Sequence, residues 1–511
     1  MASLSPLPGV LGQRRAAHLL RRASFRYTKA TVDQMAAQTA VQALGPLLAL
    51  YPLQLDQPVY SVSNATAPVT WINPPGTALP AGVQDFQLRP YVRGWWVNEA
   101  LHDPGMGHKM TFFFHQYLVT SIIGNGSTAT YFDYLALLRW GALGNFKKLA
   151  AKIIVDNTML RYLNNNENTA LNPNENFARE YFELFTIGKG PQIAPGDYTH
   201  YTEDDIVAAA RLLTGFRTQA NRNTVDPETG IPRGVSQFNA HDTGAKAFSS
   251  KFQGTVIPGA TNAGSMFTEL NAFVEMIFAQ PETARNLCRR LYRYLVYRDI
   301  TDEIEQDIIV PLANTLIANN YEIKPVLSQL LASEHFYDAD DSDLSDEIVG
   351  GMIKSPLELA LHSISFFDVP VPDPNAGKKE KKKEPQASRP VVGVPFAVVP
   401  SFHLEPLFGV IPSAVLLGPR CYAGLFYRGD AIDVSGSQIV VSGATFAAIG
   451  DKAVSAGESS HIEVRGGTVE RAAIAVVAKD RSAVEIADLT VHSVEHFVLA
   501  AYIKKAEFGP A

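Results

Sequence analysis

Three similar triplets recur near the end of this 511-residue chain, at offsets of 23 and then 22 residues: Ile439-Val440-Val441, Ile462-Glu463-Val464 and Val484-Glu485-Ile486. A repeat of this length predicts a stack of short elements, because one repeat cannot bury its own apolar face. Inside each triplet the first and third residues are apolar, which is typical of strands with one face turned inward. We therefore predict the rungs of a short parallel β-helix over residues 429–511.

The rest of the chain lacks this repeat. Amphipathic stretches such as 203–215, 281–297 and 323–334 predict helices. The segment 216–262 is long for a loop, which indicates a functional or packed excursion. The fold class we predict is multidomain, a mainly α-helical N-terminal domain followed by a short β-helix, and its parts are a helical domain over 1–370, a charged flexible linker over 371–390, an apolar Pro-rich connection or solenoid cap over 391–428, and rungs over 429–511.

Composition narrows the class of protein. The formal net charge of -7 argues against nucleic acid as a partner. Cys288 and Cys421 lie in different regions, which excludes a disulfide framework and a cysteine metal site. No run of eighteen apolar residues occurs, so no membrane span is predicted. The start of the chain lacks the pattern of a signal peptide, which predicts a cytoplasmic protein, or an exported or surface protein if a leader has been removed.

Several stretches, in order along residues 10–370, carry a resemblance to a known family. They include His108-Lys109-Met110-Thr111-Phe112-Phe113-Phe114-His115, Pro173-Asn174-Glu175-Asn176-Phe177-Ala178-Arg179-Glu180 and Ile353-Lys354-Ser355-Pro356. By these motifs the region resembles the bacterial domain-of-unknown-function family numbered 1800. The resemblance implies a large helical domain and no established activity. Tyr117 stands where many members have a second histidine after His115, so a His-x-His metal pair does not carry over.

The C-terminal piece is similar to right-handed parallel β-helix repeat proteins, through Gly450-Asp451-Lys452-Ala453 and Lys479-Asp480. Such folds include polysaccharide lyases and inert adhesion or assembly modules, and the fold alone does not choose between them. The open end of a short β-helix is a sheet edge that needs covering. A second chain could supply that cover, so we expect a homo-oligomer or a larger self-assembly.

Residues 175–186 give the first candidate site. As one regular helix they would separate a polar face from an apolar face. The polar face would hold Glu175, Asn176, Arg179, Glu180, Glu183 and Thr186. Three readings stay open: a solvated face with intrahelical ion pairs, an arginine that bridges carboxylates of packed helices, or a Glu180–Glu183 pair for acid–base work or a hard metal ion.

Histidines and basic residues extend this hypothesis. If His115 and His241 converge with Glu180 and Glu183, the four would form either a catalytic acid–base centre or a His/carboxylate site with a divalent metal as its cofactor. An anionic substrate would then be bound by basic side chains, namely Arg21, Arg22, Arg179 and Lys246. The competing reading is that each histidine is a hydrogen-bonded core residue and each basic residue is solvated or salt-bridged.

Three functions follow from these patterns. The first is a non-enzymatic protein of assembly or surface attachment that self-associates. The second is an enzyme, hydrolase-like or metal-dependent, with its centre in the helical domain. The third is a glycan-binding module on the β-helix, with a polysaccharide as partner.

Overall fold

The computed structural model describes residues 2–49, 56–60, 69–72, 79–80, 82–123, 126–340, 348–349, 351–369, 371, 422–423, 432–435, 438–446, 452–457, 460–470, 472–479 and 481–502. The chain splits into two compact units, Met1–Glu380 and Lys381–Ala511. The predicted linker and the predicted Pro-rich connection lie outside the described residues, apart from 371 and 422–423.

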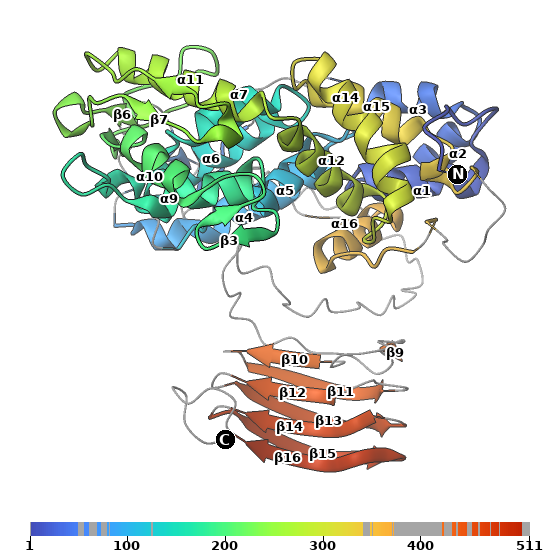
Figure 1. Ribbon diagram of the computed structural model, residues 1–511. Helices are drawn as coiled ribbons and strands as arrows, with labels where there is room; N and C mark the ends of the chain where they lie inside the picture. Colours follow the sequence, from blue (N-terminus) through green and yellow to red (C-terminus); the bar gives the residue numbers. More distant parts are fainter. Residues whose placement is uncertain are drawn as a thin grey trace. The chain divides into compact units, whose positions relative to one another are not determined.

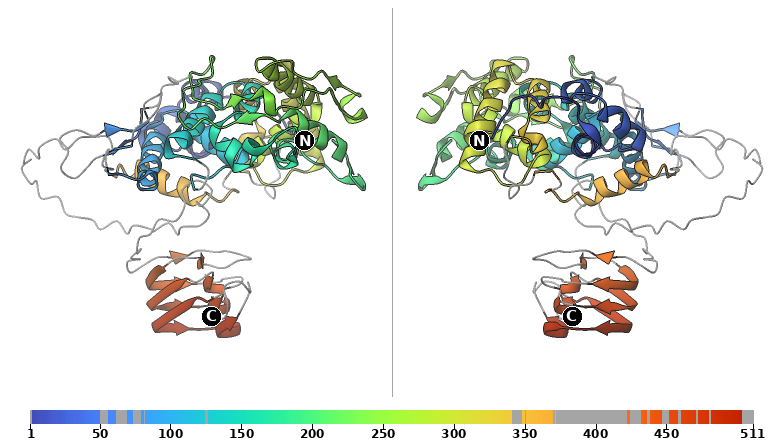
Figure 2. Two further views of the ribbon diagram at one scale, coloured as in Figure 1. Left: turned by 90° about the vertical axis from the view of Figure 1, so that its left-hand side faces the viewer. Right: turned by 90° about the vertical axis from the view of Figure 1, so that its right-hand side faces the viewer.

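The first unit is mainly helical (Figures 1 and 2). Its α-helices are α1 Gly12–Ala23, α2 Lys29–Ala36, α3 Ala40–Leu47, α4 Asp85–His102, α5 Gly107–Tyr117, α6 Thr128–Gly141, α7 Phe146–Ile153, α8 Asn157–Tyr162, α9 Glu175–Glu180, α10 Glu203–Leu212, α11 Ser265–Phe278, α12 Pro281–Leu295, α13 Asp302–Ile304, α14 Val310–Ala318, α15 Ile323–Ala332 and α16 Pro356–Phe366. Two π-helical segments interrupt them, η2 Tyr181–Phe185 and η5 Glu305–Ile309.

The helical unit also contains short pairs of antiparallel strands. They are β1 Val59–Tyr60 with β2 Val69–Thr70, β3 Gln192–Ala194 with β4 Asp197–Tyr198, β5 Phe216–Arg217 with β6 Val235–Ser236, and β7 Lys246–Ala247 with β8 Val256–Ile257. The last two pairs lie in the long segment 216–262. That segment therefore has structure of its own.

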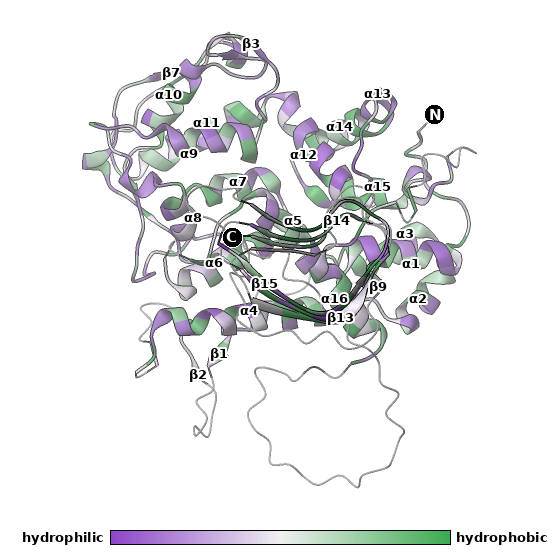
Figure 3. Cartoon of the chain, turned by 90° about the horizontal axis from the view of Figure 1, so that it is seen from below, coloured by the Kyte–Doolittle hydropathy of each residue, from purple (hydrophilic) through white to green (hydrophobic). Residues whose placement is uncertain are grey.

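The core of the helical unit is built around α5 and α6, which are buried along almost their whole length. Aromatic rings join neighbouring helices there, as where Phe114 of α5 stacks on Phe146 of α7 with ring centroids 5.8 Å apart. Peripheral helices are amphipathic, and Figure 3 shows hydrophilic and hydrophobic residues mixed along them. Their starts are fixed by side chains, for example at α10, where Thr202 and Asp205 form a reciprocal cap.

The second unit contains two four-stranded sheets in its described part (Figure 1). One has the order β10-β12-β14-β16, with bounds Ile432–Ser435, Lys452–Gly457, Ala472–Lys479 and Val494–Tyr502. The other has the order β15-β13-β11-β9, with bounds Ala483–Val491, His461–Val469, Gln438–Phe446 and Tyr422–Ala423. All these pairings are parallel, and successive strands from β10 to β16 alternate between the sheets. Seen from below, the strands of each sheet lie one above another (Figure 3).

The register of these sheets follows the sequence repeat. Ile439 pairs with Ile462, which pairs with Val484. The threonines do the same along the ladder Thr445, Thr468 and Thr490. The predicted mainly helical N-terminal region and the predicted stack of parallel strands are thus both confirmed.

Candidate functional site

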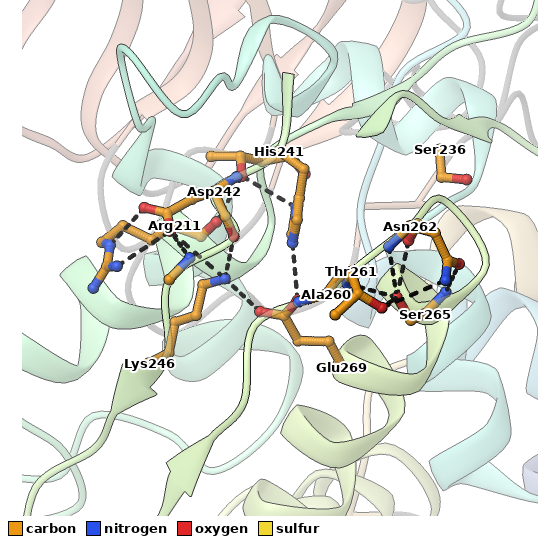
Figure 4. Close-up of polar contacts among 12 residues, drawn as sticks. Arg211, Ser236, His241, Asp242, Lys246, Ala260, Thr261, Asn262, Ser265 and Glu269 are labelled. Atoms are coloured by element: carbon orange, nitrogen blue, oxygen red, sulfur yellow. Dashed lines mark hydrogen bonds and ion pairs between the residues drawn. The ribbon is translucent and has the colours of Figure 1, made fainter. Parts of the chain in front are cut away.

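Two of the predicted site residues, His241 and Lys246, meet at a carboxylate of α11, that of Glu269 (Figure 4). The Nε2 atom of His241 lies 2.8 Å from Glu269 Oε2, and Lys246 Nζ lies 2.5 Å from Glu269 Oε1. The backbone N–H of Ala260 donates to the same Oε2 atom at 2.8 Å. The side chains of His241, Lys246 and Glu269 are buried, with exposed fractions of 0–1%.

The other ring nitrogen of His241 also faces an acceptor, since Nδ1 lies 2.8 Å from the carbonyl oxygen of Thr214. The Thr214 hydroxyl cannot supply a proton to that nitrogen, because it donates to the carbonyl oxygen of Arg211 at 2.7 Å. Each ring nitrogen of His241 thus faces an oxygen atom within hydrogen-bond distance. His241 is held between α11 and the end of α10 by these two hydrogen bonds.

A second ion pair borders the network and is half-exposed. Arg211 donates from Nε to Asp242 Oδ2 at 2.8 Å and from Nη2 to Oδ1 at 3.2 Å (Figure 4). Lys246 also donates to the backbone carbonyl of Asp242. Together these contacts fasten the segment 216–262 to α10 and α11, so that segment is packed. Every charge in the buried part has an opposite partner, which is the condition for burying charges at tolerable cost.

A glycine and a polar turn determine how closely the segment 216–262 approaches α11. A Cβ atom on Gly259 would lie 2.0 Å from the carbonyl oxygen of Thr243, so only glycine allows the two chain segments to come so close. Asn262 Oδ1 accepts from the backbone N–H of Ser265 at 3.0 Å and fixes the start of α11 (Figure 4). Glu269 then lies on the buried side of that helix, between Met266 and Phe273.

The sequence reasoning did not select Glu269. The signal was present, because Glu269 stands three residues after Met266 and four before Phe273, on the apolar face of a helix. A glutamate in that position needs a cationic partner when it is buried. The sequence does not reveal that His241 and Lys246 are those partners, since they come from a separate turn of the chain.

In the first half of the stretch 175–186, the polar side chains lie on one face, as the sequence predicts. Arg179 bonds Glu175 one turn earlier at 3.2 Å and binds Glu203 of α10 with two hydrogen bonds of 2.8 and 2.7 Å. The hydrogen bonds with Glu203 raise the pKa of the Arg179 guanidinium further. Arg179 thus combines two of the readings, an intrahelical ion pair and a bridge between helices, on a partly exposed surface.

The reading of this stretch as one regular helix is wrong from Tyr181 onward. The chain changes there to the π-helix η2, which inserts an extra residue into the turn and shifts the phase of the faces. Leu184, assigned to the apolar face, is 42% exposed, and Thr186, assigned to the polar face, is buried. Thr186 donates instead to the carbonyl oxygen of Tyr181 at 2.6 Å.

Glu180 and Glu183 are close enough to influence each other. Partial burial raises the pKa of Glu180, and the charge of Glu183 adds to this. Glu183 accepts a hydrogen bond from the Tyr201 hydroxyl and forms an ion pair with Lys189 at 3.2 Å. The raised pKa of Glu180 is compatible with acid–base work and equally with a surface ion-pair network. Their catalytic role stays a prediction.

His115 lies in the core of the helical unit. Its Nε2 atom is hydrogen-bonded to the Tyr131 hydroxyl at 2.8 Å, and burial lowers its pKa to about 3. His115 is thus hydrogen-bonded to α6, whereas His241 is hydrogen-bonded to Thr214, just after α10, and to Glu269 of α11. Tyr117, which replaces the second histidine of the resemblance, donates its hydroxyl to the carbonyl oxygen of Phe185 at 2.9 Å. A catalytic role for His115 or His241 stays a prediction.

Arg21 and Arg22 end α1 near two other cations, Lys109 and Lys354, and one carboxylate, Glu358. Lys109 of α5 pairs with Glu358 of α16 in the interior. Burial lowers the pKa of Lys354 to about 8, and the charge of Arg21 contributes to this shift. The excess of positive charge is consistent with an anionic ligand, and this assignment also stays a prediction.

No described group of three or more His, Cys, Asp or Glu side chains is placed to hold a metal ion. Likewise, none of the described helices combines the length and the apolar character needed to cross a membrane. A divalent metal cofactor therefore stays a prediction without a ligand set among these residues.

Comparison with known protein families identifies the family of the helical unit. A family described as "Protein of unknown function (DUF1800)" matches residues 18–390. The chain belongs to the DUF1800 family. The resemblance seen in the sequence motifs is confirmed over most of the helical unit of this DUF1800 protein. No curated protein and no solved structure matches the chain.

The last strands of the DUF1800 protein present a different kind of candidate site. Along one ladder, Val441 and Val464 are buried at 0%, whereas Ile486 of β15 is 38% exposed. Along the other ladder, Val476 is 3% exposed and Leu499 of β16 is 61% exposed. Positions that are core in the earlier rungs are therefore surface in the last one.

Proposed function

We propose that this DUF1800 protein serves in assembly or surface attachment, and that two copies associate through the last rung of a right-handed parallel β-helix. The proposal is supported by one observation above all. Ile486 and Leu499 occupy ladder positions that are buried in the preceding rungs, and they are exposed at the end of the stack. Val498 adds a further aliphatic side chain that is 51% exposed.

The strand edges support the same proposal. β15 and β16 are the outermost strands of their sheets in the described part of the chain, and each pairs on one side only. A free edge carries unpaired N–H and C=O groups that can pair with another chain. Two copies related by a twofold axis would bring each last rung against its own equivalent, with antiparallel contacts between the edges.

The energetic gain is moderate for each side chain and adds up over the contact. Burial of a leucine or isoleucine side chain that was exposed contributes roughly 1–3 kcal/mol. Leu499, Val498 and Ile486 from both copies thus supply the apolar centre of the contact. Because the contact is apolar, added salt should not dissociate the dimer.

Sedimentation velocity of the full chain tests the proposal. The wild-type protein is expected to sediment as a dimer or larger species at micromolar concentration, and Leu499→Lys is expected to weaken association about a hundredfold. Leu171→Lys is the matched control, since Leu171 of the helical unit is 99% exposed. Circular dichroism checks that the variants are folded. A wild-type protein that stays monomeric at all concentrations, or a Leu499→Lys variant that associates like the control, contradicts the proposal.

The enzyme and the glycan-binding module stay predictions. The His241 and Glu269 side chains are at most 1% exposed, so their network favours neither alternative.

A further inference from the structure

A cavity of about 360 Å³ opens between three helices of the helical unit, and none of the residues of the His241–Glu269 network lines it. Asp85 and Arg89 come from the first turns of α4, Ser127 and Thr130 from the start of α6, and Asn157 and Arg161 from α8. The loop after β5 closes it with Thr218, Gln219 and Ala220. The volume lies within the range of pockets that hold small molecules.

Two guanidinium groups line this cavity. Arg89 is half-buried and Arg161 is exposed, and each is one helical turn away from another lining residue of its own helix. Within the described part of the chain, no carboxylate forms an ion pair with either arginine. Two guanidiniums that share a concave surface without an anionic partner favour a carboxylate or phosphate ligand.

Asn157 supplies the second observation, which is independent of charge. Its side chain is 2% exposed, and its Oδ1 atom accepts from the backbone N–H of Gln219 at 2.7 Å. This bond fixes the orientation of the amide, so that the remaining group is the Nδ2 donor. Nδ2 is buried and has no hydrogen-bond partner. Buried donors are almost always paired, so an unpaired one on a residue that lines a cavity points to an acceptor in a ligand.

Asp85 determines which kind of anion the cavity can bind. Its two carboxylate oxygens accept from the Thr128 backbone N–H at 3.0 and 3.1 Å, and Oδ1 also accepts from the Thr128 hydroxyl at 2.8 Å. These hydrogen bonds fix the carboxylate at the start of α6. A dianionic phosphate would be repelled by it, whereas a hydroxyl group of a ligand could donate to its remaining lone pairs. Hydroxyls of Ser127 and Thr218 line the same wall.

We propose that this cavity binds a small hydroxylated monocarboxylate of the sugar-acid class. The carboxylate of the ligand lies between Arg89 and Arg161 and accepts from Asn157 Nδ2, while its hydroxyl groups face Asp85. The site lies in the helical unit and does not rest on the association of the last rungs. It differs from the predicted catalytic set, none of whose residues lines it.

Isothermal titration of the full chain at low salt tests this site, with glucuronate, glucose and inorganic phosphate as probes. The wild-type protein is expected to bind glucuronate, and Arg161→Gln and Arg89→Gln are each expected to weaken that binding by about ten- to a hundredfold. Arg26→Gln is the matched control, because Arg26 is an exposed arginine outside the cavity.

Any of the following titration results would contradict the proposal. Absence of glucuronate binding by the wild-type protein, or equal affinity in Arg161→Gln and Arg26→Gln, removes the site. Tighter binding of phosphate than of glucuronate overturns the choice of a monocarboxylate. Binding of glucose as tight as that of glucuronate shows that the arginines do not recognise the ligand.

Discussion

Replacement of His115 by glutamine should change how the stability of the helical unit depends on pH. His115 is buried in the core, and this burial lowers its pKa from the ordinary value of 6.5 to about 3. Between these two values the unfolded chain binds a proton that the folded chain does not. Acid therefore favours unfolding, and the contribution of neutral His115 to stability is full above pH 6.5 and is lost as the pH falls toward 3.

The size of the effect follows from the same two values. The free energy of unfolding changes by about 1.4 kcal/mol for each pH unit over which only the unfolded state is protonated. Between pH 7 and pH 5 the imidazole of His115 thus removes roughly 2 kcal/mol of stability. In His115→Gln this part of the pH dependence disappears, while the hydrogen bond with Tyr131 can be made by the glutamine amide. His18 and His362, with pKa values lowered by burial to about 3 and about 4, act in the same direction.

Urea unfolding followed by tryptophan fluorescence measures this effect in the helical unit alone, because all four tryptophans lie there: Trp71, Trp95, Trp96 and Trp140. The quantity compared is the change in unfolding free energy between pH 7 and pH 5, so any constant loss in the variant cancels. His102→Gln is the control, since His102 is exposed and keeps its contact with water in both states. Equal changes with pH in the wild-type protein and in His115→Gln would refute the reasoning.

Two further predictions concern the same unit and use the same unfolding assay. Asp133→Asn leaves the buried guanidinium of Arg222 without the carboxylate that forms two hydrogen bonds with it, and should lower the free energy of unfolding by about 3–5 kcal/mol. Asp33→Asn, in an exposed ion pair, should cost far less. Similar losses in the two variants would contradict the account. Gly259→Ala places a Cβ atom 2.0 Å from a backbone carbonyl oxygen and should destabilise by about 1–3 kcal/mol. Gly94→Ala, in open space inside α4, should instead stabilise by about 0.5–1 kcal/mol. A neutral Gly259→Ala would show that the close approach is absent.

The spacing of residues predicted the parallel strands because register in a stack is set by the repeat length itself. Ile439, Ile462 and Val484 pair in the order that their offsets require. Amphipathic patterns likewise predicted helices such as α10 and α15, since burial of one face is a local property of the sequence.

Features that depend on a change of backbone hydrogen bonding could not be predicted in this way. The π-helix at Tyr181–Phe185 turns Leu184 outward and Thr186 inward, and nothing in the residue types announces it. The partner of His241 was hidden for another reason. Glu269 lies 28 residues further along the chain, and only the packing of the segment 216–262 on α11 brings the two side chains together.

The cavity residues show a third limit of prediction from the sequence. Arg89 and Arg161 are ordinary helical arginines in the sequence, and they gain meaning only beside the unpaired amide of Asn157. Whether a buried donor lacks a partner is a property of the folded chain.

Hydrogen exchange measured by mass spectrometry at several protein concentrations tests the association of the last rungs most directly. The backbone amides of Val494–Tyr502 should exchange more slowly as the concentration rises, because copies cover this edge strand, while those of the interior strand His461–Val469 should not change. Exchange in Val494–Tyr502 that is the same at every concentration would contradict the account.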